Sequence, residues 1–355
     1  MHPRTLLVTG GAGFIGSALV RHLISDTPHR VVNVDKLTYA GHVESLADAA
    51  ESSRHHLERI DIADGAAVAD VFERYQPDAV VHLAAETHVD RSIDGPAEFL
   101  RTNVQGTFVM LEASRRYWDR LSGGQWEEFR FLHVSTDEVY GSLGDEGRFR
   151  EDSRYDPRSP YSASKASADH FAKAYHHTYD LPVIVTNCSN NYGPYQFPEK
   201  LIPLATLRAS AGEPIPVYGE GENVRDWLHV DDHVRGLMAA LEEGRPGETY
   251  NIGGDSERTN LQVVKTICEA LDELVPSTRP YHRLIEFVAD RPGHDLRYAV
   301  DAGKIRNELG WAPRVAFESA LRETVAWYLD NRAWCEAVTR GAAYRLERLG
   351  KREQE

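Results

Sequence analysis

A short apolar strand followed at once by three evenly spaced glycines is the feature that most limits how this chain can fold. Residues 6–9 run into Gly10, Gly13 and Gly16, and a helical stretch over residues 17–23 follows. In such a strand–turn–helix unit, the glycines permit a tight turn, a close approach of backbone to pyrophosphate, and close helix–strand packing. The helix N-terminus then presents N–H groups to the phosphates. A glycine-rich turn alone is common, but this setting predicts a dinucleotide site on a doubly wound parallel α/β sheet.

An acidic residue at the end of the next expected strand indicates which dinucleotide binds. Residues 31–34 form that strand, and Asp35 follows it, nineteen residues after Gly16. A carboxylate at this point accepts hydrogen bonds from ribose hydroxyls and repels a 2′-phosphate. The sequence therefore favours NAD over NADP.

The bulk properties exclude several classes of protein. The chain has 355 residues, of which 41% are hydrophobic and 27% charged, so we expect one large globular unit or two closely joined ones. A net charge of −15 argues against nucleic acid and anionic membranes as partners. We expect no membrane span, no targeting leader and a cytoplasmic location. The three cysteines, Cys188, Cys268 and Cys335, lie far apart and indicate a reducing compartment.

The stretch from residue 131 to residue 165 carries the candidate chemistry. Residues 131–135 predict a buried strand that delivers Thr136, Asp137 and Glu138 to its carboxyl end, where open parallel sheets bind ligands. Tyr161 and Lys165 are four apart at the start of a helix and so share a face. A nearby ammonium group lowers the pKa of a tyrosine, and adjacent carboxyls in different surroundings can act as acid and base. Each feature alone is more often chance or solvated surface, but together, beside a dinucleotide site, they indicate catalysis.

These residues resemble the extended short-chain dehydrogenase/reductase superfamily. Tyr161 and Lys165 with Ser135 match its signature, and the triplet from Thr136 to Glu138 is similar to the variant found in nucleotide-sugar 4,6-dehydratases. Four further runs resemble the dTDP-glucose 4,6-dehydratases, so that the resemblance covers about residues 4–335. These runs are residues 35–41, 84–92, 190–203 and 290–295.

The resemblance implies NAD as cofactor, dTDP-glucose as substrate, and a homodimer formed through the helices near residues 99–118 and 163–179. The candidate catalytic residues are Thr136, Asp137, Glu138, Tyr161 and Lys165. The candidate cofactor-binding residues are Gly10, Gly13, Phe14, Ile15, Gly16, Asp35, Lys36, Thr38, Asp61, Ile62, Leu83, Ala84, Ala85, Thr102, Ser135, Tyr161, Lys165 and Asn191. The candidate substrate-binding residues are Thr87, Thr136, Asp137, Glu138, Tyr161, Asn190, Glu199, Lys200, Leu201, Pro216, Tyr218, Arg225, Asn260, Arg291, His294 and Tyr298.

The chain is expected to divide into two interleaved parts and a tail. The NAD-binding part takes residues 1–188 with a return segment at 226–254, and the nucleotide-sugar part takes 189–225 and 255–340. A charged tail follows at 341–355. Strands are also expected at 57–62, 78–83 and 249–252, one helix at 97–118, and two helices within 301–334. In so acidic a chain, Lys200, Arg225 and the cluster from Arg291 to Tyr298 supply local positive charge for a nucleotide diphosphate.

No metal site is expected. His133, His170, His176 and His177 lie near one another in the sequence, but His176 and His177 are adjacent on the expected helix and so point apart.

These expectations describe an NAD-dependent lyase that oxidises C4 of a nucleotide sugar, removes water across C5 and C6, and reduces C6. A 4-epimerase on the same scaffold needs Tyr161 and Lys165 but not an Asp–Glu pair, and a 4,6-dehydratase of another nucleotide sugar is a second alternative. A catalytically silent NAD-binding protein is an alternative from another class, against which the intact Thr136, Tyr161 and Lys165 argue.

Overall fold

The computed structural model describes residues 2–290 and 293–340. A parallel sheet of seven strands lies at the centre of the larger of its two parts. The strand order is β10-β6-β5-β4-β1-β2-β3, which confirms the expected doubly wound sheet. The chain leaves β1 for β2 on one side and returns to β4 on the other, so the switch point lies at the carboxyl end of β1. The strands are β1 (Thr5–Thr9), β2 (Arg30–Val34), β3 (His55–Glu58), β4 (Ala79–His82), β5 (Arg130–Thr136), β6 (Val183–Cys188) and β10 (Thr249–Ile252).

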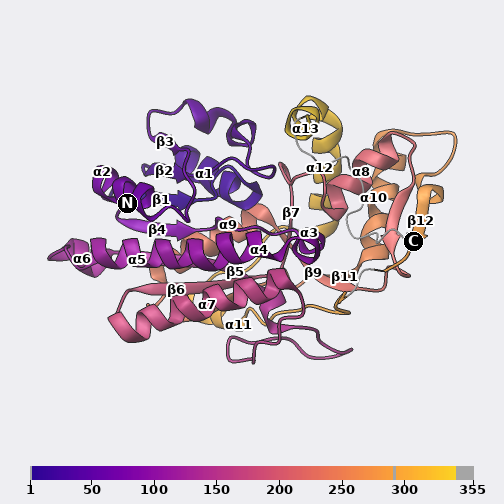
Figure 1. Cartoon of the computed structure of the whole chain (residues 1–355). Helices are drawn as coiled ribbons and strands as arrows, with labels where there is room; N and C mark the ends of the chain where they lie inside the picture. Colours follow the sequence, from indigo (N-terminus) through magenta and orange to yellow (C-terminus); the bar gives the residue numbers. More distant parts are fainter. Residues whose placement is uncertain (1, 291–292, 341–355) are drawn as a thin grey trace.

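Helices bury both faces of this sheet (Figure 1). One face packs against α1 (Phe14–Asp26), η1 (Val43–Glu51), α9 (Val230–Glu243) and α11 (Gly303–Leu309). The other packs against α2 (Gly65–Tyr75), α5 (Thr107–Trp118) and α7 (Pro160–Tyr179). Because both faces are covered, every residue of β4, β6 and β10 is buried.

The helices α5 and α7 lie side by side across the second face (Figure 1). The segment 97–118, expected as one helix, is three consecutive pieces: α4 (Pro96–Phe99), the wider turns of η2 (Leu100–Gly106), and α5. In η2 the side chain of Asn103 donates to the hydroxyl of Ser164 at 2.8 Å and accepts from the backbone N–H of Glu86 at 2.8 Å. The η2 segment is therefore tied both to α7 and to the chain that follows β4. The short helices α3 (Val89–Asp94) and α6 (Gly124–Glu128) and the turn η3 (Asp137–Tyr140) complete this part.

The smaller part lies to the right in Figure 1. It contains the three-stranded sheet β11-β9-β7 and the pair β12-β8, with the rings of Tyr192, Trp227 and Phe317 in its core. The strands are β7 (Asn190–Tyr192), β8 (Ile215–Tyr218), β9 (Val224–His229), β11 (Glu257–Thr259) and β12 (Ile285–Val288). The helices are α8 (Leu201–Ser210), α10 (Asn260–Leu274), η4 (Tyr281–Leu284), α12 (Phe317–Asp330) and α13 (Arg332–Thr339).

Several expected boundaries were wrong. The strand expected at 57–62 ends at Glu58, because Asp61 accepts a hydrogen bond from the backbone of Ala63 and starts the turn into α2. The strand β9 lies in the small sheet, where Asp226 accepts hydrogen bonds from the backbone N–H groups of Gly254 and Ser256 next to β11. Three helices, not two, begin between residues 301 and 334. Arg291 and the expected tail at 341–355 lie outside the described residues.

Candidate active site

The glycine turn after β1 is shaped for a phosphate group. Gly10 has a φ of +70°, and a Cβ there would lie 2.8 Å from the backbone nitrogen of Ala84. A Cβ on Gly16 would lie 2.1 Å from the carbonyl oxygen of Gly10. The helix α1 starts after Gly13 with no side-chain cap, so the N–H groups of its first turn are left for a ligand.

A cavity of about 300 Å³ opens at this turn and extends along the carboxyl ends of the strands. It is lined by seventeen of the eighteen candidate cofactor-binding residues, Asp61 being the exception. The side-chain oxygens of Asn190 and Asn191, which also line the cavity, are buried without a hydrogen-bond partner. A bare glycine turn, an elongated cavity and unpartnered acceptors together fit a bound dinucleotide.

Asp35 and Asp61 differ in their relation to this cavity. The carboxylate of Asp35 accepts hydrogen bonds from the backbone N–H groups of Ala12 at 3.0 Å and Leu37 at 2.8 Å, which holds it at the cavity wall. Burial raises the pKa of Asp35. Asp61 instead forms ion pairs with Arg101 at 3.0 Å and Lys36 at 3.7 Å, and its neighbour Ile62 lines the cavity.

The turn that follows β5 places two carboxyl groups against the cavity. Asp137 is 2% exposed, and its Oδ2 atom has no hydrogen-bond partner. Burial, together with the negative charges of Glu138 and Asp226, raises the pKa of Asp137 well above its usual range. The hydroxyl of Thr136 donates to Asp137 Oδ1 at 3.3 Å and accepts from the backbone N–H of Glu138. The shift favours the protonated form of Asp137, while the less buried Glu138 lies one residue further along.

The first turns of α7 bring Tyr161 and Lys165 to the opposite wall. Pro160 begins the helix, and Ser159 and Ser162 form a reciprocal capping box that fixes its start. Lys165 Nζ donates to the carbonyl oxygen of Val134 at 2.9 Å. Burial and the charge of Glu138 raise the pKa of Tyr161 well above its usual value, with the Thr136 hydroxyl acting in the other direction. Within the described chain, the net shift is therefore opposite to the one that we expected from Lys165.

The candidate substrate-binding residues separate into two groups. Thr87, Asn190, Glu199 and Lys200 line the cavity with the catalytic candidates. Outside the cavity wall lie Leu201, Pro216, Tyr218, Arg225, Asn260, His294 and Tyr298.

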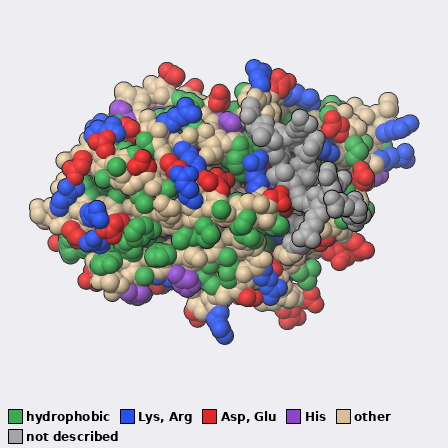
Figure 2. All heavy atoms as spheres, viewed as in Figure 1, with side chains coloured by type: hydrophobic (Ala, Val, Ile, Leu, Met, Phe, Trp, Pro, Cys, Tyr) green, Lys and Arg blue, Asp and Glu red, His purple; other side chains and the backbone are tan. Residues whose placement is uncertain are grey.

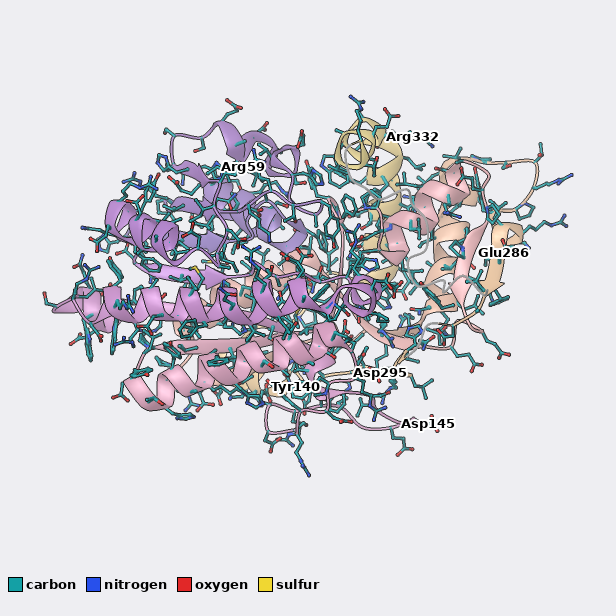
Figure 3. The ribbon with its side chains drawn as sticks, viewed as in Figure 1. Arg59, Tyr140, Asp145, Glu286, Asp295 and Arg332 are labelled. Atoms are coloured by element: carbon teal, nitrogen blue, oxygen red, sulfur yellow. The ribbon has the colours of Figure 1, made fainter. Side chains whose placement is uncertain are left out.

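The outer group is organised around Arg225. Its guanidinium group stacks 4.4 Å from the ring centroid of Tyr298 and donates to the carbonyl oxygen of Asp295 at 3.0 Å. Figure 3 labels Asp295 where the smaller part meets the larger one. Tyr218 donates to Asp90 of α3 at 2.9 Å, so this group also contacts the larger part.

Sequence reasoning missed one polar cluster at the cavity edge. The carboxylate of Glu199 lies 3.5 Å from the hydroxyl of Tyr39, 3.6 Å from His88 and 3.8 Å from Arg91. Arg91 also stacks over the ring of Tyr39 at 3.6 Å. All four residues fall within the runs 35–41, 84–92 and 190–203, but only their contact in the fold relates them. Further cavity-lining residues that were not expected are Val34, Ala40, Gly41, Ile60, Glu86, Val134, Cys188, Ser189, Gln196 and Phe197.

Comparison with known proteins agrees with this geometry. The family model described as GDP-mannose 4,6 dehydratase matches residues 7–324. A dTDP-glucose 4,6-dehydratase of Neisseria meningitidis serogroup B is 60% identical over 98% of this chain and 99% of its own, and dTDP-glucose 4,6-dehydratase 1 of Escherichia coli K12 is 58% identical over 95% and 96%. The chain belongs to the dTDP-glucose 4,6-dehydratase family. The resemblance drawn from the motifs is therefore confirmed.

Solved structures extend the comparison. DesIV, a dTDP-glucose 4,6-dehydratase from Streptomyces venezuelae solved with NAD and TYD bound, is 47% identical with a TM-score of 0.86, covering 94% of this chain and 99% of that one. A Thermus thermophilus UDP-glucose 4-epimerase in complex with NAD is 28% identical with a TM-score of 0.81, covering 92% and 99%. Dehydratases and epimerases thus share this scaffold, and the site residues must separate them.

Two negative findings apply to the part of the chain that the structure describes. Within residues 2–290 and 293–340, no group of three or more His, Cys, Asp or Glu side chains is arranged to hold a metal ion. Over the same residues, no helix has the length and apolar character needed to cross a bilayer.

Proposed function

We propose that this chain binds NAD and converts dTDP-glucose to dTDP-4-keto-6-deoxyglucose and water. The observation that carries the proposal is that Asp137 and Glu138 share one cavity with Tyr161, Lys165 and the glycine turn, in a chain 60% identical to a dTDP-glucose 4,6-dehydratase. Neither part is sufficient alone, because the scaffold also serves epimerases and paired carboxyls also occur on surfaces.

Different cofactor-binding residues bind different parts of the dinucleotide. The first turn of α1 takes the pyrophosphate, and Asp35 takes the ribose hydroxyls next to the adenine. Lys165 and Tyr161 lie at the far end of the cavity and orient the nicotinamide ribose. Bound there, NAD would supply the acceptor for the hydride from C4 and the source of the hydride for C6.

Oxidation at C4 is assigned to the α7 wall. Tyr161 accepts the proton of the C4 hydroxyl, while the Thr136 hydroxyl donates a hydrogen bond to the same oxygen. A phenol titrates near 10 in water, and burial moves the pKa of Tyr161 further upward, so it needs positive charge close by to act as a base. Lys165 supplies one positive charge from the chain, one helical turn away.

Loss of water is assigned to the turn after β5. A ketone at C4 makes the C5 hydrogen acidic, and Glu138 removes that proton. Asp137 gives a proton to the departing C6 hydroxyl, a role that suits a buried carboxyl whose pKa is well above its usual range. The proton on Glu138 exchanges with solvent, and Glu138 then gives a solvent-derived proton to C5 as C6 is reduced. Asp137 takes up a proton from solvent and Tyr161 releases the one that it accepted, so all three groups recover.

The nucleotide end is assigned to the smaller part and its neighbours. Glu199 and Lys200 contact the sugar diphosphate at the cavity edge, and Arg225, His294 and Tyr298 bind the diphosphate and base beyond it. The physical argument supports a nucleotide diphosphate sugar, while the preference for dTDP comes from the relatives. Arg291, an expected member of this group, lies outside the described residues.

Turnover of two sugar nucleotides tests the proposal directly. We expect rapid conversion of dTDP-glucose with loss of one water, detected by mass spectrometry, and slow or no conversion of UDP-glucose. Appearance of dTDP-galactose without loss of mass would support the 4-epimerase alternative. Bound NAD with no turnover of any nucleotide sugar would support a catalytically silent binding protein.

We also propose a homodimer formed by η2, α5 and α7. Leu100, Phe108 and Phe171 expose large apolar side chains there, and the rings of Phe108 and Phe171 meet edge to face at 6.4 Å. Figure 2 shows hydrophobic side chains gathered over these helices. Sedimentation of the wild type should give a dimer at micromolar concentration, with Phe108→Glu shifting it to a monomer. A monomeric wild type would contradict this assembly.

The remaining assignments follow from the same organisation. We propose that residues 1–188 and 226–254 serve the cofactor and that 189–225 and 255–340 serve the nucleotide, with β9 as the strand that the second part takes from the return segment. We propose a cytoplasmic location, in keeping with the three cysteines, which are buried and unpaired.

A further inference from the structure

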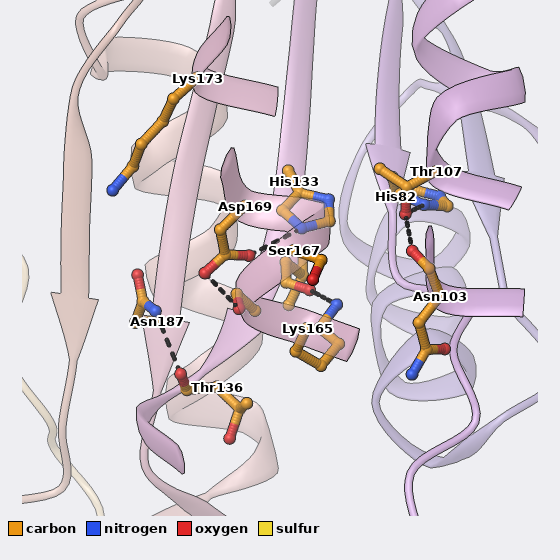
Figure 4. Close-up of polar contacts among 12 residues, drawn as sticks. His82, Asn103, Thr107, His133, Thr136, Lys165, Ser167, Asp169, Lys173 and Asn187 are labelled. Atoms are coloured by element: carbon orange, nitrogen blue, oxygen red, sulfur yellow. Dashed lines mark hydrogen bonds and ion pairs between the residues drawn. The ribbon is translucent and has the colours of Figure 1, made fainter. Parts of the chain in front are cut away.

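Four polar residues recur at every fourth position along α7: Tyr161, Lys165, Asp169 and Lys173. Residues at this spacing share one helix face, so the catalytic candidates continue into a polar stripe directed at β5. Asp169 is completely buried, whereas Lys173 at the outer end is only partly so. Figure 4 shows Lys165, Asp169 and Lys173 of this stripe, with His133 next to Asp169. The proposed reaction gives Asp169 no role, although a fully buried carboxyl is costly unless it has partners.

Three donors converge on the Asp169 carboxylate. His133 Nε2 donates to Oδ1 at 3.0 Å, and Oδ2 accepts from the Ser135 hydroxyl at 2.8 Å and the Tyr155 hydroxyl at 3.0 Å. Burial alone would raise the pKa of Asp169, but His133, Lys165 and Ser135 outweigh it and hold that pKa below its usual value. Asp169 is therefore an anion inside the fold.

Lys165 is also a buried charged group, but it is a cation. It is 4% exposed, and its ammonium group donates to the carbonyl oxygen of Val134, which is a neutral partner. Burial lowers the pKa of Lys165, and the charge of Asp169 is the largest influence acting against that shift. Side chains four apart on a helix lie about 5–6 Å apart at Cβ, close enough for such an influence in a buried setting.

Glu138 faces the stripe at its cavity end, where its charge acts on Tyr161. The other titratable groups around Lys165 and Asp169 are neutral or lie at the far end of the stripe. On β4 and β5, burial lowers the pKa of His82 and of His133, so both rings are uncharged at neutral pH. On β6, burial raises the pKa of the Cys188 thiol to about 12. In η3, burial raises the pKa of Tyr140. Lys173 Nζ lies 3.5 Å from the hydroxyl of Tyr155, on the side of Asp169 away from the cavity.

We propose that Asp169 is a positioning residue for the reaction, acting as the buried counterion that keeps Lys165 protonated and, through Ser135, fixing the strand end that carries Thr136, Asp137 and Glu138. The same carboxylate thereby connects the α7 wall of the site to the β5 wall. This role rests on the proposed function of Lys165.

The charge of Lys165 can be measured without turnover. The chain has only seven lysines, so the ¹³Cε resonances of labelled lysine can be resolved in the NAD-bound enzyme and that of Lys165 assigned by its absence in Lys165→Met. We expect the Lys165 resonance of the wild type to be that of an ammonium group at neutral pH. In Asp169→Asn its titration midpoint should fall by about one pH unit. Tyr155→Phe, which removes one hydrogen bond to Asp169 but keeps the charge, should leave the midpoint in place.

The pH profile gives an independent readout. In Asp169→Asn, the alkaline limb of kcat should move to lower pH by the same amount as the Lys165 midpoint, and kcat at pH values above both midpoints should fall about tenfold. A purely structural role would lower kcat without moving either. An unchanged midpoint in Asp169→Asn would overturn the proposal, as would a neutral Lys165 in the wild type, which requires no variant to fold. Failure of the proposed function would appear separately, as absence of turnover with a charged Lys165.

Discussion

On α7, the charged groups Lys165 and Asp169 have hydrogen-bond partners within the fold, whereas Asp137 in the turn after β5 is just as buried but has one carboxylate oxygen without a partner. The polar groups of α7, the helix wall of the site, hydrogen-bond to other parts of the chain and so hold its charges in place. The turn after β5, the strand wall, carries a carboxyl group with one oxygen still able to bind a ligand. The comparison indicates a division of labour, in which the helix wall orients and oxidises and the strand wall exchanges protons with the substrate.

The same burial has opposite chemical meaning in the two walls. It raises the pKa of Asp137 and so favours the protonated form, which is the form that a general acid needs. It also raises the pKa of Tyr161, which disfavours the phenolate that a base needs. The protein alone therefore favours the protonation state that Asp137 needs as an acid, whereas Tyr161 needs additional positive charge nearby to act as a base.

Replacing Tyr161 should produce the largest effect, because oxidation at C4 precedes every later step. Tyr161→Phe should lower turnover by about 10²–10⁴-fold, with almost no reduced nicotinamide after substrate is added, as followed by absorbance. Tyr179→Phe, at the exposed far end of the same helix, should match the wild type. Wild-type turnover in Tyr161→Phe would contradict the assignment of C4 oxidation to the helix wall.

Replacing Glu138 should block the loss of water at the strand wall while oxidation of C4 at the helix wall continues. Glu138→Gln keeps the side-chain shape but removes the base for C5, so product formation should fall by a factor within the same range of about 10²–10⁴. Oxidation should continue, and reduced nicotinamide should therefore accumulate on the enzyme. If product is lost without that accumulation, Glu138 belongs to the oxidation step and the assignment is wrong.

Some of the contacts in the two walls could be predicted from the sequence, and others could not. The glycine turn, Asp35, and the pair Tyr161 and Lys165 are predictable because spacing along one strand or one helical turn fixes their relation. The Asp169 cluster is not, since His133 and Tyr155 reach it from 36 and 14 residues away and nothing local marks them.

The smaller part shows the same limit. The sequence indicated Arg225 as a cation for the nucleotide, but its stacking on Tyr298 and its bond to the carbonyl of Asp295 depend on segments about 70 residues apart meeting in the fold. The assignment of β9 to the small sheet likewise depends on the pairing of Asp226 with the chain before β11, which hydrophobic periodicity does not encode.

Asp137 gives a smaller expected loss of activity together with a gain in stability. In Asp137→Asn, turnover should fall to the lower end of the acid–base range, about 10²-fold, because water can replace a missing acid. The folded-state pKa of Asp137 lies above its unfolded value near 4, so the wild type loses stability as pH rises from about 4 towards the folded pKa. The Asn variant lacks that loss.

Denaturant unfolding at about pH 4 and at neutral pH measures this difference. The variant should gain stability relative to the wild type as the pH is raised. An equal difference at both pH values would mean that Asp137 is ionised in the folded enzyme, which would remove the basis for its role as an acid.

The smallest expected effect lies outside both walls, at Asp35. Asp35→Ser should weaken NAD binding by roughly ten- to a hundredfold, as expected for loss of hydrogen bonds to a charged group, and should narrow the preference for NAD over NADP. Calorimetric titration of both dinucleotides measures the ratio. A wild type that binds NADP as tightly as NAD would contradict the interpretation of Asp35.

Isotope transfer in the wild type tests the division of labour most directly. dTDP-glucose carrying deuterium at C4 should give, in ordinary water, a product with that deuterium at C6 and none in the solvent. Unlabelled substrate in heavy water should give one deuterium at C5. Loss of the C4 label to solvent, or absence of solvent deuterium at C5, would contradict the account in which the helix wall oxidises C4 and the strand wall exchanges the C5 proton.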